Sequence, residues 1–268
     1  MASFSVVSNI ASSNAQTMLH GTNMGLNKAL QRLSSGLRIN ASGDDAAGLA
    51  VANSYRNDVA VMNQGVRNAN DGLSKLQIKD SALQNIATVL DRMATLATQA
   101  SSSSNGVDIT KLSAEYNTLT LEIDREAAVA GMTATASFSV FVSSEATVSN
   151  GAVSGSIGSV LTADLGITQT TFGTVTQAQA ALAQIETAIS NLGSSQATIG
   201  TLQNRLQFAI GLAQSQIVNT QAAESRIRDA NIAEESANMT RYNILSQAGI
   251  AALAQANQAT SSVLALLR

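Results

Sequence analysis

The sequence predicts a mainly α-helical fold: a long antiparallel helical bundle or coiled-coil rod formed by the N- and C-terminal segments, with a small β element in the middle. Apolar or small residues recur at alternating three- and four-residue steps near both ends, which is typical of helices that pack on other helices. The 268 residues contain no proline, the residue that breaks helix interiors. Aromatic residues make up 3% of a chain that is 45% hydrophobic, so Ala, Leu, Ile and Val must supply most of the packing.

The first helix is expected over residues 8–33 and carries leucines at heptad spacing. Turn chemistry follows over residues 34–45, where SSGLRINASGDD holds two glycines, an Asn and paired aspartates. Asp44 and Asp45 are placed to cap the next helix and to favour its dipole. The leucine stripe runs from the helix into this turn and consists of Leu19, Leu26, Leu30, Leu33 and Leu37.

Two further helices precede the middle of the chain. The first is expected over residues 46–99, where leucines recur on one face, and SSSSNG at residues 101–106 ends it. The second is expected over residues 108–129, with its apolar residues again on one face. The inner arms of the chain should pair as a bundle, and the two ends should meet as an extended coiled coil.

The composition changes at Gly131, after which Ser, Thr, Val and Gly dominate. Residues 138–142 alternate apolar and polar side chains, which predicts a strand. Two more short strands are expected over residues 148–153 and 156–161, split by Asn150-Gly151 and by Gly155. The segment therefore predicts a small β element and not a large domain.

Helix is predicted again from about residue 176, with a hinge over residues 222–228 before a terminal helix. A terminal helix with so regular a stripe needs a partner from elsewhere in the chain or from another copy. This indicates a self-assembling structural protein. The stripe of small and apolar residues consists of Leu245, Gly249, Ala252, Ala256, Ala259, Val263 and Leu266.

Composition argues against several classes of function. The net charge is −3 with no run of Lys or Arg, so nucleic-acid binding is not expected. Without cysteine there is no disulfide or thiolate site, and the lone His20 has no carboxylate cluster beside it, so neither metal nor cofactor is expected. No catalytic Ser/His/Asp set stands out, so the chain is not expected to be an enzyme. Neither a Sec-type signal peptide nor a membrane-spanning stretch is apparent, and Ala-rich stripes with Asn/Gln/Ser-rich polar faces disfavour a membrane-surface helix.

Four motifs in order carry a family resemblance. They are LSSGLRINASGDDAAGLAV at residues 33–51, RNANDGLS at 67–74, ESRIRD at 224–229 and AGIAALAQANQ at 248–258, before a final VLALLR. Together they closely resemble bacterial flagellin, over about the first 135 and last 90 residues. One departure is Ala259-Thr260, where flagellins commonly have Val-Pro.

The resemblance implies an architecture and a role. Residues 1–45 and 225–268 would form an inner coiled-coil tube, residues 46–130 and 177–224 an outer tube, and residues 131–176 a short β-containing variable insert. The chain would be a structural subunit that polymerises into the flagellar filament for swimming, with terminal helices that order on assembly. The alternative, a hook–filament junction protein, fits the density of flagellin-like residues at both ends less well.

The resemblance also implies partners and a route. The chain would be secreted unfolded through the flagellar type III apparatus, without a cleaved signal peptide. It would work in the extracellular filament with copies of itself, a distal cap, junction proteins and an export chaperone.

Three sets of residues are predicted to carry this function. The leucine stripe of the first helix and its turn, from Leu19 to Leu37, would form subunit interfaces. The C-terminal stripe would contribute Leu245, Ala252, Ala256, Val263 and Leu266 to the same interfaces. Arg38, Asp44 and Asp45 lie in the turn that would join the two tubes, either as a solvated loop with helix caps or as an inter-subunit contact. A vertebrate innate flagellin receptor would recognise a surface on the second helix, unless Arg92 and Glu115 are an ordinary interhelical pair; the matching residues are Arg92, Leu96, Gln99 and Glu115.

Overall fold

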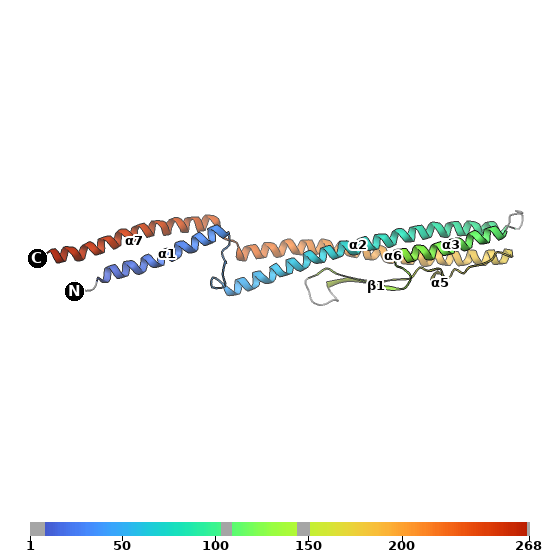
Figure 1. The fold of residues 1–268 in the computed structure, drawn as a ribbon, viewed down its shortest axis with the longest axis horizontal. Helices are drawn as coiled ribbons and strands as arrows, with labels where there is room; N and C mark the ends of the chain where they lie inside the picture. Colours follow the sequence, from blue (N-terminus) through green and yellow to red (C-terminus); the bar gives the residue numbers. More distant parts are fainter. Residues whose placement is uncertain (1–8, 103–108, 144–150, 267–268) are drawn as a thin grey trace. The chain divides into compact units, whose positions relative to one another are not determined.

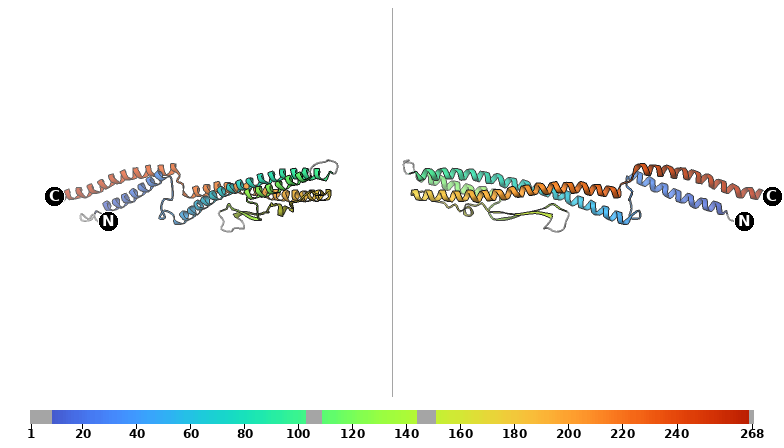
Figure 2. Two further views of the ribbon diagram at one scale, coloured as in Figure 1. Left: turned by 45° about the vertical axis from the view of Figure 1, so that its right-hand side comes forward. Right: turned by 180° about the vertical axis from the view of Figure 1, so that it is seen from behind.

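The computed structural model describes residues 9–102, 109–143 and 151–266, with side chains to residue 258. The chain divides into two compact units, residues 1–57 with 220–268 and residues 58–219 (Figures 1 and 2). Among the described residues, helices dominate and one small antiparallel sheet lies in the middle, which confirms the predicted fold class. The elements are α1 (Ile10–Ser35), α2 (Ala46–Ser101), α3 (Ile109–Val129), β1 (Ala136–Phe141), β2 (Ala152–Ile157), α5 (Thr162–Leu165), α6 (Val175–Arg228) and α7 (Ile232–Leu266).

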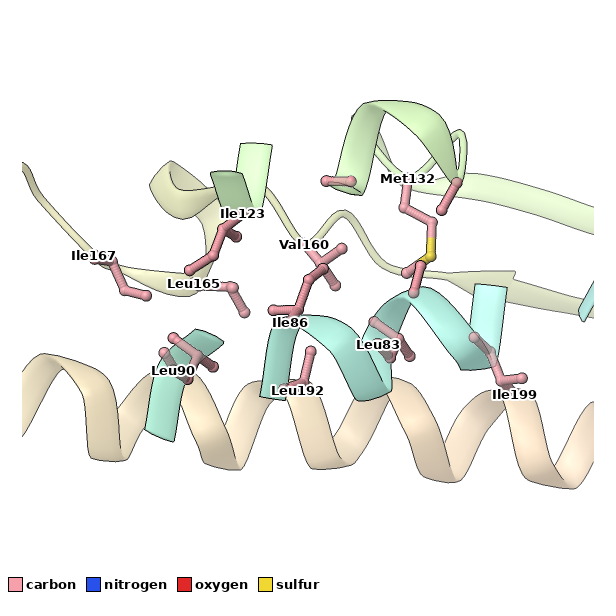
Figure 3. Packing of buried hydrophobic residues seen from close by; sticks show 14 of the residues in the cluster. Leu83, Ile86, Leu90, Ile123, Met132, Val160, Leu165, Ile167, Leu192 and Ile199 are labelled. Atoms are coloured by element: carbon pink, nitrogen blue, oxygen red, sulfur yellow. The ribbon is translucent and has the colours of Figure 1, made fainter. Parts of the chain in front are cut away.

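The core of the unit formed by residues 58–219 lies between α2, α3 and α6. Leucine and isoleucine side chains from the three helices meet there, and the segment around α5 closes the core from one side (Figure 3). Tyr116 of α3 packs edge-on against Phe172, with ring centroids 4.9 Å apart. The labelled residues that fill this core are Leu83, Ile86, Leu90, Ile123, Met132, Val160, Leu165, Ile167, Leu192 and Ile199.

The β1–β2 hairpin lies directly against α2 and α6. Its strands pair from Ala136 with Ile157 to Phe141 with Ala152. Close approach depends on glycines: a Cβ on Gly72 of α2 would meet Val140 at 2.8 Å, and one on Gly155 of β2 would meet Leu202 of α6 at 2.7 Å. A side chain at either position would have to displace the apolar side chain that now lies over the glycine.

The predicted break at Gly155 is wrong, because β2 runs through this residue without interruption. A glycine inside a strand can mark a close contact as well as a turn, and here the contact with Leu202 explains it. Residues 148–150 of the predicted strand over residues 148–153 lie outside the described residues. The single turn α5 was not predicted.

The predicted hinge over residues 222–228 is also wrong. Helix α6 continues through this stretch to Arg228, and the break falls immediately after it, at residues 229–231. Asn231 begins α7 as its N-cap, with its side-chain oxygen 3.2 Å from the Ala233 amide. Residues 222–228 therefore belong to the last turns of α6.

In the unit formed by residues 1–57 and 220–268, α1 and α7 lie antiparallel to each other (Figure 1). Asn9 contacts Ala256 near one end of the pair, and Arg32 contacts Glu235 near the other. No described helix of the chain has the length and apolarity that a membrane crossing requires.

Candidate assembly surface

The interface between α1 and α7 is built from small residues facing large ones. The ring of Tyr242 lies over Gly25, where a Cβ would be 2.6 Å from Cζ. The relation is reversed near the far end, where Leu19 packs on Gly249 and a Cβ would be 3.1 Å from Cδ1. The two helices are therefore held in one register by two reciprocal contacts, and neither contact tolerates a larger residue without a shift.

Polar contacts fix both ends of the pair. The Asn9 amide donates to the Ala256 carbonyl at 3.0 Å. At the other end, Arg32 Nη1 lies 2.9 Å from Glu235 Oε1, and Glu235 is buried. A buried carboxylate requires such a partner, so this ion pair fixes the register where the chain leaves α1.

The predicted interface residues divide between this seam and the outer surface. On α1, Leu19, Leu26 and Leu33 are half-buried on the α7 side, whereas Leu30 is exposed, and Leu37 lies in the turn, bridged to Asp229. On α7 the seam uses Gly249 and Ala256 from the predicted stripe. It is completed by Glu235, Met239, Tyr242, Ser246 and Leu253.

The other half of the predicted α7 stripe faces away from α1. Leu245 is 47% exposed and Ala252 is exposed. The side chains of Val263 and Leu266 lie outside the described residues. A second apolar stripe therefore stays uncovered in the single chain, and its role as a subunit interface stays a prediction.

Charge is absent from the terminal part of this helix pair. Residues 1–27 and 242–267 contain no Asp, Glu, Lys or Arg. Within the described part, Met18, Met24, Ile244 and Ile250 are exposed besides Leu245. An uncharged helix with apolar residues on all sides is typical of a buried environment. Mapping charge along the sequence would have revealed this signal, which the heptad analysis alone did not use.

The turn after α1 is docked on the end of α6. The Arg38 amide donates to the Arg228 carbonyl at 2.7 Å, and its guanidinium donates to the Ile227 carbonyl at 2.9 Å. Both acceptors belong to the last turn of α6, whose carbonyls have no partner within the helix. Arg38 therefore caps a helix that lies far from it in sequence.

The two aspartates of this turn do different things. Asp45 is the N-cap of α2, because its Oδ1 accepts from the Gly48 amide at 2.9 Å. Asp44 instead accepts from the amides of Asn40 and Ala41 and lies 2.6 Å from Lys28 Nζ. The hydrogen bond from Lys28, followed by that from the Asn40 amide, lowers the pKa of Asp44 to about 2. These contacts fit the capped-loop interpretation of the turn.

Not all residues of the predicted receptor surface are exposed. Arg92 forms an ion pair with Glu115 across α2 and α3, with Nε and Nη2 2.9 Å and 2.5 Å from Oε1, and both side chains are exposed. Gln99 is exposed as well. Leu96, however, is fully buried, so its assignment to a recognition surface is corrected. It is a core residue because it faces into the bundle one turn beyond Arg92.

The described residues contain no cluster of three or more His, Cys, Asp or Glu side chains that could hold a metal ion. Tyr116 is the one strongly perturbed phenol, since burial raises its pKa to about 12. It lies in the hydrophobic core of the unit formed by residues 58–219.

The N-terminal and C-terminal parts of the sequence both match known protein families. Residues 6–133 match the family described as bacterial flagellin N-terminal helical region, and residues 182–267 match the bacterial flagellin C-terminal helical region. The flagellar filament 33 kDa core protein of Treponema phagedenis is 36% identical over 287 residues, covering 97% of this chain and 98% of that protein.

Two further relatives are named flagellin. The flagellin of Halalkalibacterium halodurans is 36% identical over 282 residues, covering 97% of this chain and all of that protein (100%). The crystal structure of Bacillus cereus flagellin has 30% sequence identity and a TM-score of 0.48, covering 59% of this chain and 94% of that one. With both terminal regions matched and with relatives aligned over nearly their full length, the chain belongs to the bacterial flagellin family.

Proposed function

We propose that this chain assembles into the flagellar filament chiefly through the uncharged outer surface of its α1/α7 pair. Membership of the flagellin family makes it a structural subunit of that filament and not an enzyme. The proposed assembly surface consists of Leu245 and Ala252 of α7 and the exposed methionines of α1.

The observation that carries the proposal is the charge-free terminal sequence. Residues 242–267 hold no Asp, Glu, Lys or Arg, yet α1 covers only one face of α7. Burying the remaining faces against other copies removes apolar surface from water at roughly 25 cal/mol per Å². It strands no charge, which would cost several kcal/mol for each unpaired ion.

Two variants of Ala252 test this surface. Glu and Gln have the same shape and similar helix propensity, so Ala252→Glu and Ala252→Gln differ only in charge. Both should leave the circular dichroism of the monomer unchanged, because Ala252 is exposed there. In seeded polymerisation followed by electron microscopy, Gln should permit filaments and Glu should abolish them. Equal polymerisation of both variants would refute the assigned surface.

The layered architecture is part of the same proposal. Residues 1–45 and 225–268 would form the inner layer of the filament, and residues 46–130 and 177–224 the outer layer, with residues 131–176 as the insert. The division of the chain into two compact units supports this assignment. We also propose that α1 and α7 order fully only on docking, since a small-residue seam stabilises an isolated pair weakly.

The route of export and the accessory partners are proposed from membership of the family. We propose secretion through the flagellar type III apparatus with an export chaperone, and contacts with a distal cap and junction proteins at the filament ends. For the innate receptor, exposed Arg92, Gln99 and Glu115 are the available contacts, since Leu96 is in the core. The existing Arg92–Glu115 ion pair would have to be shared with the receptor.

A further inference from the structure

Methionine sulfur is the most readily oxidised group in this chain, because the sequence contains neither cysteine nor tryptophan. Two methionines of α1 are open to solvent, Met18 with 74% and Met24 with 61% of the side chain exposed. Met239, in the seam between α1 and α7, is half-buried. The methionines that are buried are Met62, Met93 and Met132. Since a dissolved oxidant acts where it can reach the sulfur, the fold separates an open pair from a protected set.

The open pair lies in an uncharged part of the chain. Residues 1–27 contain no Asp, Glu, Lys or Arg, and residues 242–267 contain none either. The large side chains exposed on this part of α7 are aliphatic and include Leu245 and Ile250. A thioether suits such surroundings because it is apolar and flexible. A polar group introduced at the same two positions would have no charged partner nearby.

We propose that Met18 and Met24 are oxidation sites through which hydrogen peroxide controls whether a free subunit can assemble. This rests on the proposed function, in which both side chains belong to the assembly surface. The thioether sulfur attacks one oxygen of the peroxide, the O–O bond breaks, and that oxygen stays on the sulfur as a sulfoxide. The other oxygen leaves as water. The sulfur loses two electrons, and the peroxide gains them.

The sulfoxide changes the assembly surface without changing the core. Its oxygen is a strong hydrogen-bond acceptor, and burying it without a donor costs free energy that the thioether does not cost. Met93 and Met132 lie in the core of residues 58–219, where the oxidant does not reach them. An oxidised subunit therefore keeps its fold and adds weakly to a filament. A sulfoxide reductase reverses the step: its dithiol becomes a disulfide, and the oxygen leaves as water.

The first measurement locates the oxidised sulfurs by mass spectrometry of peptides from the peroxide-treated full-length chain. In the monomer, Met18 and Met24 should be oxidised at least about tenfold faster than the buried Met62, Met93 and Met132. Equal rates would overturn the division between open and protected sulfurs. In filaments, the oxidation of Met18 and Met24 should slow by at least about tenfold, because neighbouring copies cover them. An unchanged rate in filaments would overturn the proposal.

The second measurement combines peroxide with substitution. Leucine is apolar, is close to methionine in volume and does not form a sulfoxide, so Met18→Leu together with Met24→Leu should remove the sensitivity. Met62→Leu is the matched control, because it keeps both exposed sulfurs. After peroxide, the critical concentration for seeded polymerisation should rise about tenfold or more in wild type and in the control, and stay within about twofold of the untreated value in the double variant. Methionine sulfoxide reductase with a dithiol should restore the oxidised wild type.

The outcomes separate this proposal from the proposed function. If untreated wild type does not polymerise on seeds, the proposed function fails, and the peptide measurement on the monomer still tests which sulfurs are open. If untreated wild type polymerises and the oxidised chain matches it, Met18 and Met24 do not control assembly. A double variant that stays as sensitive as wild type, or an oxidised wild type that the reductase does not restore, would overturn the proposal as well.

Discussion

Two glycines in long helices should respond in opposite directions to the same substitution. Gly65 of α2 lies under the hairpin, where a Cβ would be 2.7 Å from the carbonyl carbon of Val142 and 2.8 Å from its Cα. Gly200 of α6 has no neighbouring atom within 4 Å of such a Cβ. The comparison isolates the packing contribution, because the helical cost of glycine is the same at both sites.

The magnitudes follow from these distances. Alanine in place of a helical glycine stabilises by about 1 kcal/mol where nothing interferes, which is the expectation for Gly200→Ala. At Gly65 the obstacle is backbone, so the hairpin must move by more than half an ångström to restore ordinary contact, roughly at the upper end of the 1–3 kcal/mol range for overpacking. Gly65→Ala should therefore lose about 2 kcal/mol net.

Urea unfolding of the monomer, followed by circular dichroism, measures both changes in the free energy of unfolding. Thermal melting is a second measurement: for a unit of this size, 1 kcal/mol corresponds to roughly 2–4 °C, so the two variants should melt on opposite sides of wild type. If Gly65→Ala is as stable as Gly200→Ala, the hairpin does not lie on α2 as described, and the role assigned to glycine at this contact is refuted.

Three other substitutions test separate parts of the chain. Asp44 has a pKa lowered to about 2 from 3.8, so its contribution to stability is complete above the higher value and is lost as pH falls toward 2; the difference in melting temperature between wild type and Asp44→Asn should close over that window, and a constant difference would contradict the assignment. Arg38→Ala removes a donor to the Ile227 carbonyl and should cost about 1 kcal/mol in urea unfolding, whereas no change would show that the cap is unimportant. The Tyr116 hydroxyl is buried and has no hydrogen-bond partner among the described residues, so Tyr116→Phe should be neutral or stabilising by about 1 kcal/mol; a marked loss would reveal a partner.

Periodicity and turn chemistry predicted the helices well, for a physical reason. The apolar faces of α1, α2 and α3 repeat with the helical period, and the glycine that ends α1, Gly36, has the left-handed φ of 71° that favours this residue. The hinge was placed over residues 222–228, just before the actual break at residues 229–231. Asn231, a strong N-cap residue, was the better local signal.

The site was harder to predict because its determinants are contacts between distant residues. The α7 seam includes Glu235, Tyr242 and Ser246, which an apolar pattern leaves out; each is explained only by its partner on α1. Leu96 was assigned to a surface because it matches the family pattern together with Arg92, yet the bundle buries Leu96 and leaves Arg92 exposed. Sequence spacing gives the angle around a helix axis, and the neighbours decide which angles are buried.

The pairing of α1 with α7 also dictates an order of events during synthesis. Asn9 and Ala256 are 247 residues apart in sequence, so α1 leaves the ribosome long before its partner exists. The unit of residues 58–219 is continuous and closes its core without either end, whereas closing the loop between the two ends carries the largest entropic cost in the chain. We therefore expect the pairing of α1 with α7 to be the last step of folding, because it cannot begin until α7 has been made.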